Sequence, residues 1–173
     1  MPNLTVLLAG YGAYHRDPRN RLTHYFGVPA IAYAVLAAAA LSVVTIFGIA
    51  VSLDRVIVAV FVLFYLSLDL RLGIALAIAL TLLAWAAEAT TRLGVPGCLA
   101  LAGAVFVLGW TLQLFGHHLE GNRPALLTNL FQIVVAPVYL AAEGSFAMGL
   151  HKGLQSAVAE RLGPPAPPKR SQS

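Results

Sequence analysis

Long apolar stretches alternate with short polar segments along this chain of 173 residues. Residues 25–53 contain no Asp, Glu, Lys, Arg or His. The part after Pro29, residues 30–53, reaches across ~30 Å of hydrocarbon at ~1.5 Å per helical residue. Residues 93–116 form a second uncharged stretch of sufficient length. The pattern predicts one membrane span in each stretch.

Two shorter apolar runs, residues 56–68 and 72–87, lie between these spans and are separated by a polar turn at residues 69–71. We expect a helical hairpin, because the backbone groups of an unpaired helix end cannot stay unsatisfied in lipid. A hairpin that crosses twice, or that dips in and returns, gives no net crossing. The polar segments at residues 15–24 and 117–120 should therefore emerge on the same membrane face.

The two ends of the chain have patterns of their own. Apolar residues recur at three- and four-residue intervals over residues 4–14, which predicts a short helix on the bilayer surface or on the protein. Pro137 interrupts the apolar run at residues 124–142, and basic residues follow, so we expect a broken or re-entrant helix. Residues 163–173 should be a disordered Pro-rich tail, and residues 1–162 one membrane-embedded domain.

The composition agrees with a membrane protein, since 59% of the residues are hydrophobic and 10% are charged, against about a quarter charged in soluble domains. We therefore predict an all-α polytopic membrane helical bundle with about four spans. The chain has a net charge of +4, and its basic residues lie at the ends of apolar runs. This placement favours membrane lipid over nucleic acid as a partner.

The positive charges also suggest an orientation. The face that carries the two polar segments would be the more basic, and we assign it to the cytoplasm of a multi-pass protein in a bacterial inner membrane, or in the endoplasmic reticulum of a eukaryote. Its arginines would be Arg16, Arg19, Arg21, Arg71 and Arg123, against Arg55 and Arg92 on the other face.

Four of the five histidines lie in two segments, residues 14–29 and 109–127. In the second segment, Gln113 and His117 share a helical face, and Glu120 follows three residues later, so one stripe of the helix turns from membrane-buried to polar. Histidine is the commonest metal ligand, and a carboxylate completes many oxygen-activating iron centres. The pattern indicates a metal site.

In the first segment, the chain must bend for two histidines to converge. His15 and His24 are nine residues apart, which places them on opposite sides of a straight helix. Asp17 followed by Pro18 is typical of a helix start, and this break removes the obstacle. We expect the new helix to be short, because the glycine and proline within residues 27–29 should end it and redirect the chain into the first span.

A single histidine at a membrane boundary is more often a hydrogen-bonded interfacial group than a metal ligand, but clustering favours a shared ion. The predicted metal ligands are His15, His24, His117, His118 and Glu120.

Other polar side chains have predicted roles around this metal. Asn20, Gln113 and Asn129 could fix the tautomers of the imidazoles through hydrogen bonds. Arg123, directly before Pro124, could bind a substrate carboxylate in a bidentate fork. The predicted catalytic residues are Arg123, Glu120, Asn20 and Gln113.

The polar residues of the two segments resemble those of the small membrane family of iron-dependent 2-hydroxy fatty acid dioxygenases. The resemblance extends from about residue 11 to Glu143. It rests on Tyr11, His15, Asn20, His24, Gly27 and Pro29, and on Gly109, Trp110, Gln113, Gly116, His117, Glu120, Arg123, Pro124, Ala125 and Leu126.

This resemblance implies Fe(II) as the cofactor, with His15, His24 and His117 matching the histidines on which the activity of that family depends. His118 adds an imidazole to the pattern, which leaves one metal or two as alternatives. The implied reaction is the alpha-oxidation of a 2-hydroxy fatty acid by dioxygen to a fatty acid one carbon shorter.

Two other functions use the same residue types. Another membrane metalloenzyme that acts on lipid, such as a zinc hydrolase or a hydroxylase, needs similar ligands. A non-catalytic membrane protein that binds lipid or metal is the second alternative. The sequence does not distinguish oligomeric states or acyl-chain lengths.

Overall fold

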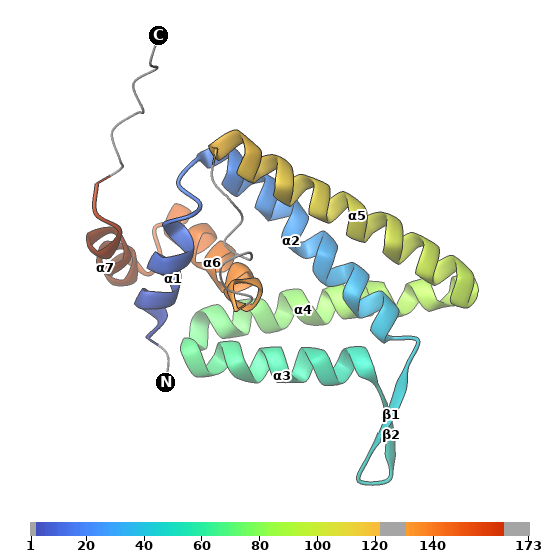
Figure 1. Cartoon of the computed structure of the whole chain (residues 1–173). Helices are drawn as coiled ribbons and strands as arrows, with labels where there is room; N and C mark the ends of the chain where they lie inside the picture. The colour runs from blue at the N-terminus through green and yellow to red at the C-terminus, as the bar shows by residue number, and fades with distance from the viewer. Residues whose placement is uncertain (1–2, 122–130, 165–173) are drawn as a thin grey trace.

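The structure, a computed structural model, describes residues 3–121 and 131–164, and most of these residues are helical (Figure 1). The prediction of a helical chain is confirmed, although a short β hairpin interrupts it. The elements are α1 Leu4–Gly12, α2 Pro18–Ala39, β1 Val43–Ile46, β2 Ile49–Ser52, α3 Leu53–Leu68, α4 Leu70–Thr90, a 3-10 turn η1 Thr91–Leu93, α5 Gly94–Glu120, α6 Gln132–Ala147 and α7 Lys152–Leu162.

α2 is one continuous helix, and the prediction that it ends at residues 27–29 is wrong. Its start is as predicted, because the Asp17 side chain accepts a hydrogen bond from the Arg19 backbone N–H at 2.8 Å and Pro18 occupies the first turn. Pro29 lies inside the helix. Membrane helices tolerate proline, because packing against neighbouring helices compensates for the missing backbone hydrogen bond.

The predicted bounds of the first span, residues 30–53, are also wrong, because the candidate span in this part of the chain is α2. α2 ends at Ala39, and β1 then pairs antiparallel with β2 around a turn at Phe47, which has a positive φ. The apolar residues of β1 are mostly β-branched, which favours extended backbone. Lack of charge alone could not separate this hairpin from the end of a span.

α3 and α4 form the predicted helical hairpin, joined at Asp69 (Figure 1). The Asp69 side chain accepts a hydrogen bond from the backbone N–H of Leu72 at 2.9 Å and so caps α4.

α2 and α5 lie side by side, and glycines allow their close approach (Figure 1). A Cβ atom at Gly27 would lie 3.0 Å from the carbonyl oxygen of Gly109, and one at Gly116 would collide with side chains of α2. This packing places the start of α2 beside the end of α5, so the two predicted polar segments meet.

α1 corresponds to the predicted N-terminal helix, and it packs on the rest of the protein. Its Leu8 and Tyr11 are buried in one core cluster with Val135 and Tyr139 of α6, and α1 also packs against α7. α6 continues through Pro137, so the expected break at this proline is wrong. A sharp bend of 115° lies further along the chain, between α6 and α7, and a re-entrant path stays a prediction.

Within the described ranges, α2 and the stretch from α4 to α5, Leu70–Glu120, are long and apolar enough to cross a membrane. The bent pair of α6 and α7 gives a third candidate if it counts as one span. α4 and α5 run in different directions on either side of η1 (Figure 1). The domain boundary at residue 162 stays a prediction.

Candidate metal centre

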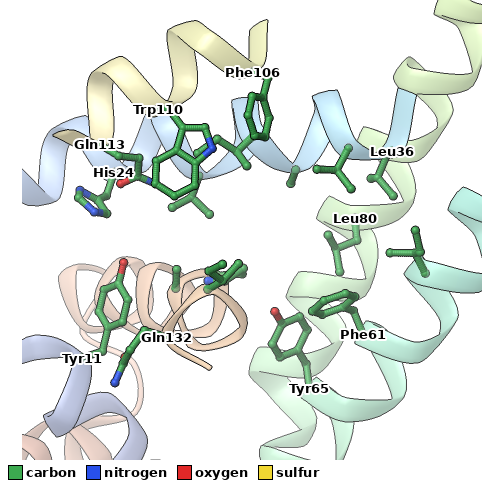
Figure 2. Close-up of a pocket in the computed structure, with 18 of the residues that line it drawn as sticks. Tyr11, His24, Leu36, Phe61, Tyr65, Leu80, Phe106, Trp110, Gln113 and Gln132 are labelled. Atoms are coloured by element: carbon green, nitrogen blue, oxygen red, sulfur yellow. The ribbon is translucent and has the colours of Figure 1, made fainter. Parts of the chain in front are cut away.

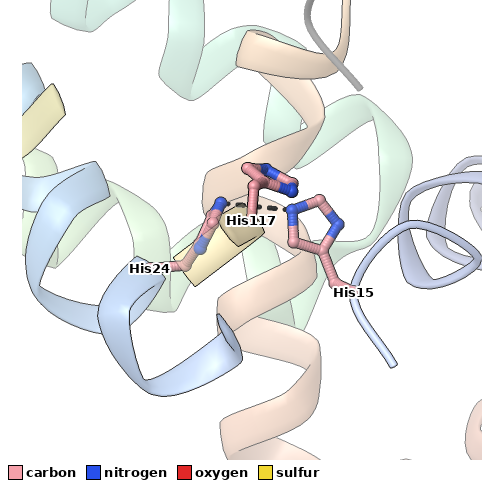
Figure 3. A group of neighbouring side chains, drawn as sticks. All are labelled: His15, His24 and His117. Carbon is pink, nitrogen blue, oxygen red and sulfur yellow. Dashed lines mark hydrogen bonds between the residues drawn. The ribbon is translucent and has the colours of Figure 1, made fainter. Parts of the chain in front are cut away.

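Three histidines from three segments face one another (Figure 3). His15 lies in the loop before α2, His24 on α2 and His117 near the end of α5, and all three are buried. One ring nitrogen of each lies within 4.8 Å of the others, and the Nε2 atoms of His15 and His24 are 3.1 Å apart. The structure thus brings together three of the four histidines that were predicted as ligands, while metal binding stays a prediction.

Backbone carbonyls orient two of the imidazoles. His15 Nδ1 donates to the Tyr11 carbonyl oxygen, and His24 Nδ1 donates to the Asn20 carbonyl oxygen, each at 2.8 Å. With Nδ1 protonated on both rings, the two facing Nε2 atoms carry lone pairs. These lone pairs repel each other unless a proton or a metal ion lies between them.

The donor set fits a metal ion. Two imidazoles that bind one ion at ~2.1 Å and about a right angle have nitrogen atoms ~3 Å apart, close to the 3.1 Å between the Nε2 atoms of His15 and His24. Hydrogen bonds from Nδ1 to backbone carbonyls are the usual support of metal-binding histidines. Fe(II) belongs to the metals that imidazole suits.

The surroundings of His15 keep it neutral. Burial lowers its pKa to about 4, so the ring is uncharged at neutral pH, the form that binds metal. The ring of Tyr11 stacks on it with centroids 4.0 Å apart and planes 2° from parallel. This contact fixes the plane of the imidazole.

Glu120 lies beside the histidines, but its carboxylate points to the start of α2. Its Oε1 accepts hydrogen bonds from the backbone N–H groups of Arg16 at 2.6 Å and of Asp17 at 3.1 Å, and its Oε2 accepts one from the Asn20 side chain. Asn20 Nδ2 also lies 3.5 Å from His117 Nδ1. In the described part of the chain, the group of converging ligand atoms comprises histidines alone.

The remaining predicted site residues are distributed differently. His118 is exposed and outside the three-histidine group. Gln113 lines the cavity described below, and its Oε1 is buried without a partner among the described residues. Arg123 and Asn129 lie outside the described residues.

A cavity of about 370 Å³ opens beside the histidines between α2, α3, α4, α5 and α6 (Figure 2). His24 and Gln113 lie at one end in this view, and Leu36 and Leu80 lie at the other. The three histidines line the cavity, and the rest of its wall is mostly apolar.

Gln132 was not among the predicted site residues. It also lines the cavity, and its buried Oε1 has no partner among the described residues. The only signal for it was an amide inside an apolar run. The apolar lining could not be recognised either, because such residues look the same whether they face lipid, core or cavity.

Residues 1–148 match the family described as 2-hydroxy-palmitic acid dioxygenase Mpo1-like. The chain belongs to this family. It is 33% identical over 163 residues to the 2-hydroxy-palmitic acid dioxygenase MPO1 of Saccharomyces cerevisiae, over 92% of this chain and 90% of the yeast protein. No solved structure matches. The resemblance drawn from the two polar segments is confirmed.

Proposed function

We propose that this chain is an Fe(II)-dependent dioxygenase that shortens 2-hydroxy fatty acids by one carbon. The observation that carries the proposal is the group of His15, His24 and His117 at the wall of a largely apolar cavity. Membership of the Mpo1-like family supports the reaction. The atoms balance, since R–CH(OH)–COOH and O₂ give R–COOH, CO₂ and H₂O without an outside reductant.

The three histidines would hold the metal through ring nitrogens that the carbonyl groups of Tyr11 and Asn20 keep correctly oriented. Bound Fe(II) supplies open coordination positions for a 2-hydroxy acid and dioxygen. The burial of the histidines excludes water from the site.

The cavity would hold the acyl chain. Burial of each substrate methylene stabilises the bound state by about 0.8 kcal/mol. An apolar cavity therefore favours a lipid over a short hydroxy acid. Gln113 and Gln132 are neutral amides in this wall, and their Oε1 atoms have no hydrogen-bond partner among the residues that the structure describes. Such acceptor atoms suit the 2-hydroxyl group of the substrate. Arg123 stays the predicted partner of the substrate carboxylate.

The same proposal includes a membrane topology. We propose that α2, α3, α4 and α5 supply about four spans and that the bent pair of α6 and α7 is re-entrant. The arginine distribution favours the histidines on the cytoplasmic face. A bacterial inner membrane is the favoured location, with the endoplasmic reticulum as the eukaryotic equivalent.

Oxygen uptake tests this function. Purified protein loaded anaerobically with Fe(II) should consume dioxygen when given 2-hydroxypalmitate and should release pentadecanoate in equal amount. Palmitate, which lacks the 2-hydroxyl group, is the control substrate and should cause no uptake. His24→Ala and His117→Ala should each abolish the reaction, and full activity in both variants contradicts the proposal.

The alternatives give different results in the same assay. A zinc hydrolase releases its product without dioxygen, and a protein that only binds lipid or metal forms no shortened acid. A hydroxylase consumes dioxygen but leaves the carbon chain at its full length. Oxygen-dependent formation of pentadecanoate therefore separates the proposed function from these alternatives.

A further inference from the structure

We infer that Glu120 is a positioning residue that joins the three histidine-bearing segments, and that it is not a metal ligand. That Glu120 is not a metal ligand rests on the function proposed above. That it joins the three segments rests on the hydrogen bonds of its carboxylate group.

Glu120 is the last residue of α5, three positions after His117. Its Oε1 accepts from the N–H groups of Arg16 and Asp17, the two peptide groups that directly follow His15. Its Oε2 accepts from the side-chain amide of Asn20, in the first turn of α2. The carboxylate therefore ties the end of α5 to both the loop and the start of α2.

Each of these bonds acts on one imidazole. The N–H of Arg16 belongs to the peptide group that begins at His15, so holding it fixes the backbone of His15. Asn20, held by Glu120 through its side chain, accepts from His24 Nδ1 through its carbonyl oxygen. His117 lies on the same turn of α5 as Glu120 itself.

A metal-binding role would disrupt these contacts. To bind the metal, the carboxylate would have to turn toward the histidines, because its oxygens are not among the converging ligand atoms. This turn would leave the peptide N–H groups of Arg16 and Asp17 without their hydrogen-bond acceptor. The negative charge also lies at the N-terminus of α2, where the helix dipole stabilises it. The carboxylate is thus held in place by the fold.

The first test uses metal-free protein and measures hydrogen exchange over residues 13–17. Glu120→Ala should speed the exchange of the Arg16 and Asp17 amides by at least ~10-fold, because their acceptor is gone. Glu120→Gln keeps one carbonyl oxygen for these amides and should restore much of the protection. Glu88→Ala is the matched control, since this carboxylate pairs with Arg55 in another part of the protein, and it should behave as wild type. Equal exchange in Glu120→Ala and wild type overturns the inference, whether or not the protein binds metal.

The second test titrates Co(II) as a spectroscopic substitute for Fe(II). Glu120→Ala should bind Co(II) about 10- to 100-fold more weakly, with an unchanged visible spectrum at saturation, and Glu120→Gln should recover most of the affinity. A shifted spectrum in Glu120→Gln together with the full loss of affinity would identify Glu120 as a ligand and overturn the inference. Absence of Co(II) binding in wild type would reject the proposed metal site, and the exchange result would still decide whether Glu120 joins the segments.

Discussion

The imidazoles of His15 and His24 meet through their Nε2 atoms, 3.1 Å apart, with both Nδ1 atoms held by backbone carbonyls. Residue types and spacing predicted that His15, His24 and His117 lie together, because Asp17 and Pro18 mark the break that lets His15 turn back. They also selected His118, which is exposed and lies outside this group. The direction in which the Glu120 side chain points was not predictable. Glu120 has suitable spacing for a ligand, yet its carboxylate turns to the start of α2.

Gln113 provides a prediction at the scale of one residue. Gln113→Ala removes a neutral amide from the cavity wall, and loss of one hydrogen bond of about 0.5–1.5 kcal/mol should raise the KM for 2-hydroxypalmitate about 2- to 10-fold. Its Co(II) affinity should stay at the wild-type value. Gln155→Ala, at an exposed position of α7, is the control and should leave KM unchanged. A weaker Co(II) affinity with a normal KM in Gln113→Ala would contradict a role toward substrate.

At the scale of elements, the sequence predicted the α3–α4 hairpin correctly because polar Asp69 marks its turn. The predictions from the sequence were wrong where apolar character was the only signal. Pro29 was expected to help end a helix, but it lies inside α2, where packing against α5 offsets the lost hydrogen bond. The β hairpin at residues 43–52 continues an uncharged stretch, so charge gave no sign of it.

The contact between α2 and α5 gives a prediction at this scale. In Gly116→Ala, the new Cβ would collide with the Thr23 hydroxyl and the Asn20 amide oxygen, which forces α5 away from α2. We expect a lower Tm and Co(II) binding weakened by at least ~10-fold, because His117 moves with α5. Thermal unfolding in detergent and Co(II) titration measure both effects.

Gly103→Ala is the matched control on α5, since a Cβ atom at Gly103 meets nothing within 4 Å. Alanine has the better helix propensity by about 1 kcal/mol, so the Tm of this variant should be equal to or above that of wild type. Equal Tm and Co(II) affinity in Gly116→Ala and Gly103→Ala would show that close packing at Gly116 does not hold the site.

At the scale of the whole molecule, the path of the chain brings residues 15–24 and residue 117 together at one end of the α2–α5 pair. The sequence allowed this prediction because a hairpin between two spans gives no net crossing. The cavity could not be predicted, since it forms only when helices from distant parts of the chain enclose a space with mostly apolar walls.

The far end of this cavity yields a prediction about chain length. Leu80→Phe should fill space opposite the histidines and shift preference from 2-hydroxypalmitate toward 2-hydroxyoctanoate. Each excluded methylene should cost about 0.8 kcal/mol, or about fourfold in kcat/KM. Competition between the two acids measures the shift. Leu82→Phe, at an exposed position on the same helix, is the control, and an equal shift in both variants would argue against acyl binding in this cavity.

The metal content of the protein tests the central claim most directly. After anaerobic reconstitution with Fe(II) and removal of excess metal, wild type should retain one iron per chain, with imidazole scattering in its X-ray absorption spectrum. His15→Ala, His24→Ala and His117→Ala should each retain at least ~10-fold less. Wild-type protein without bound iron, or alanine variants with as much iron as wild type, would contradict a single ion held by these three histidines.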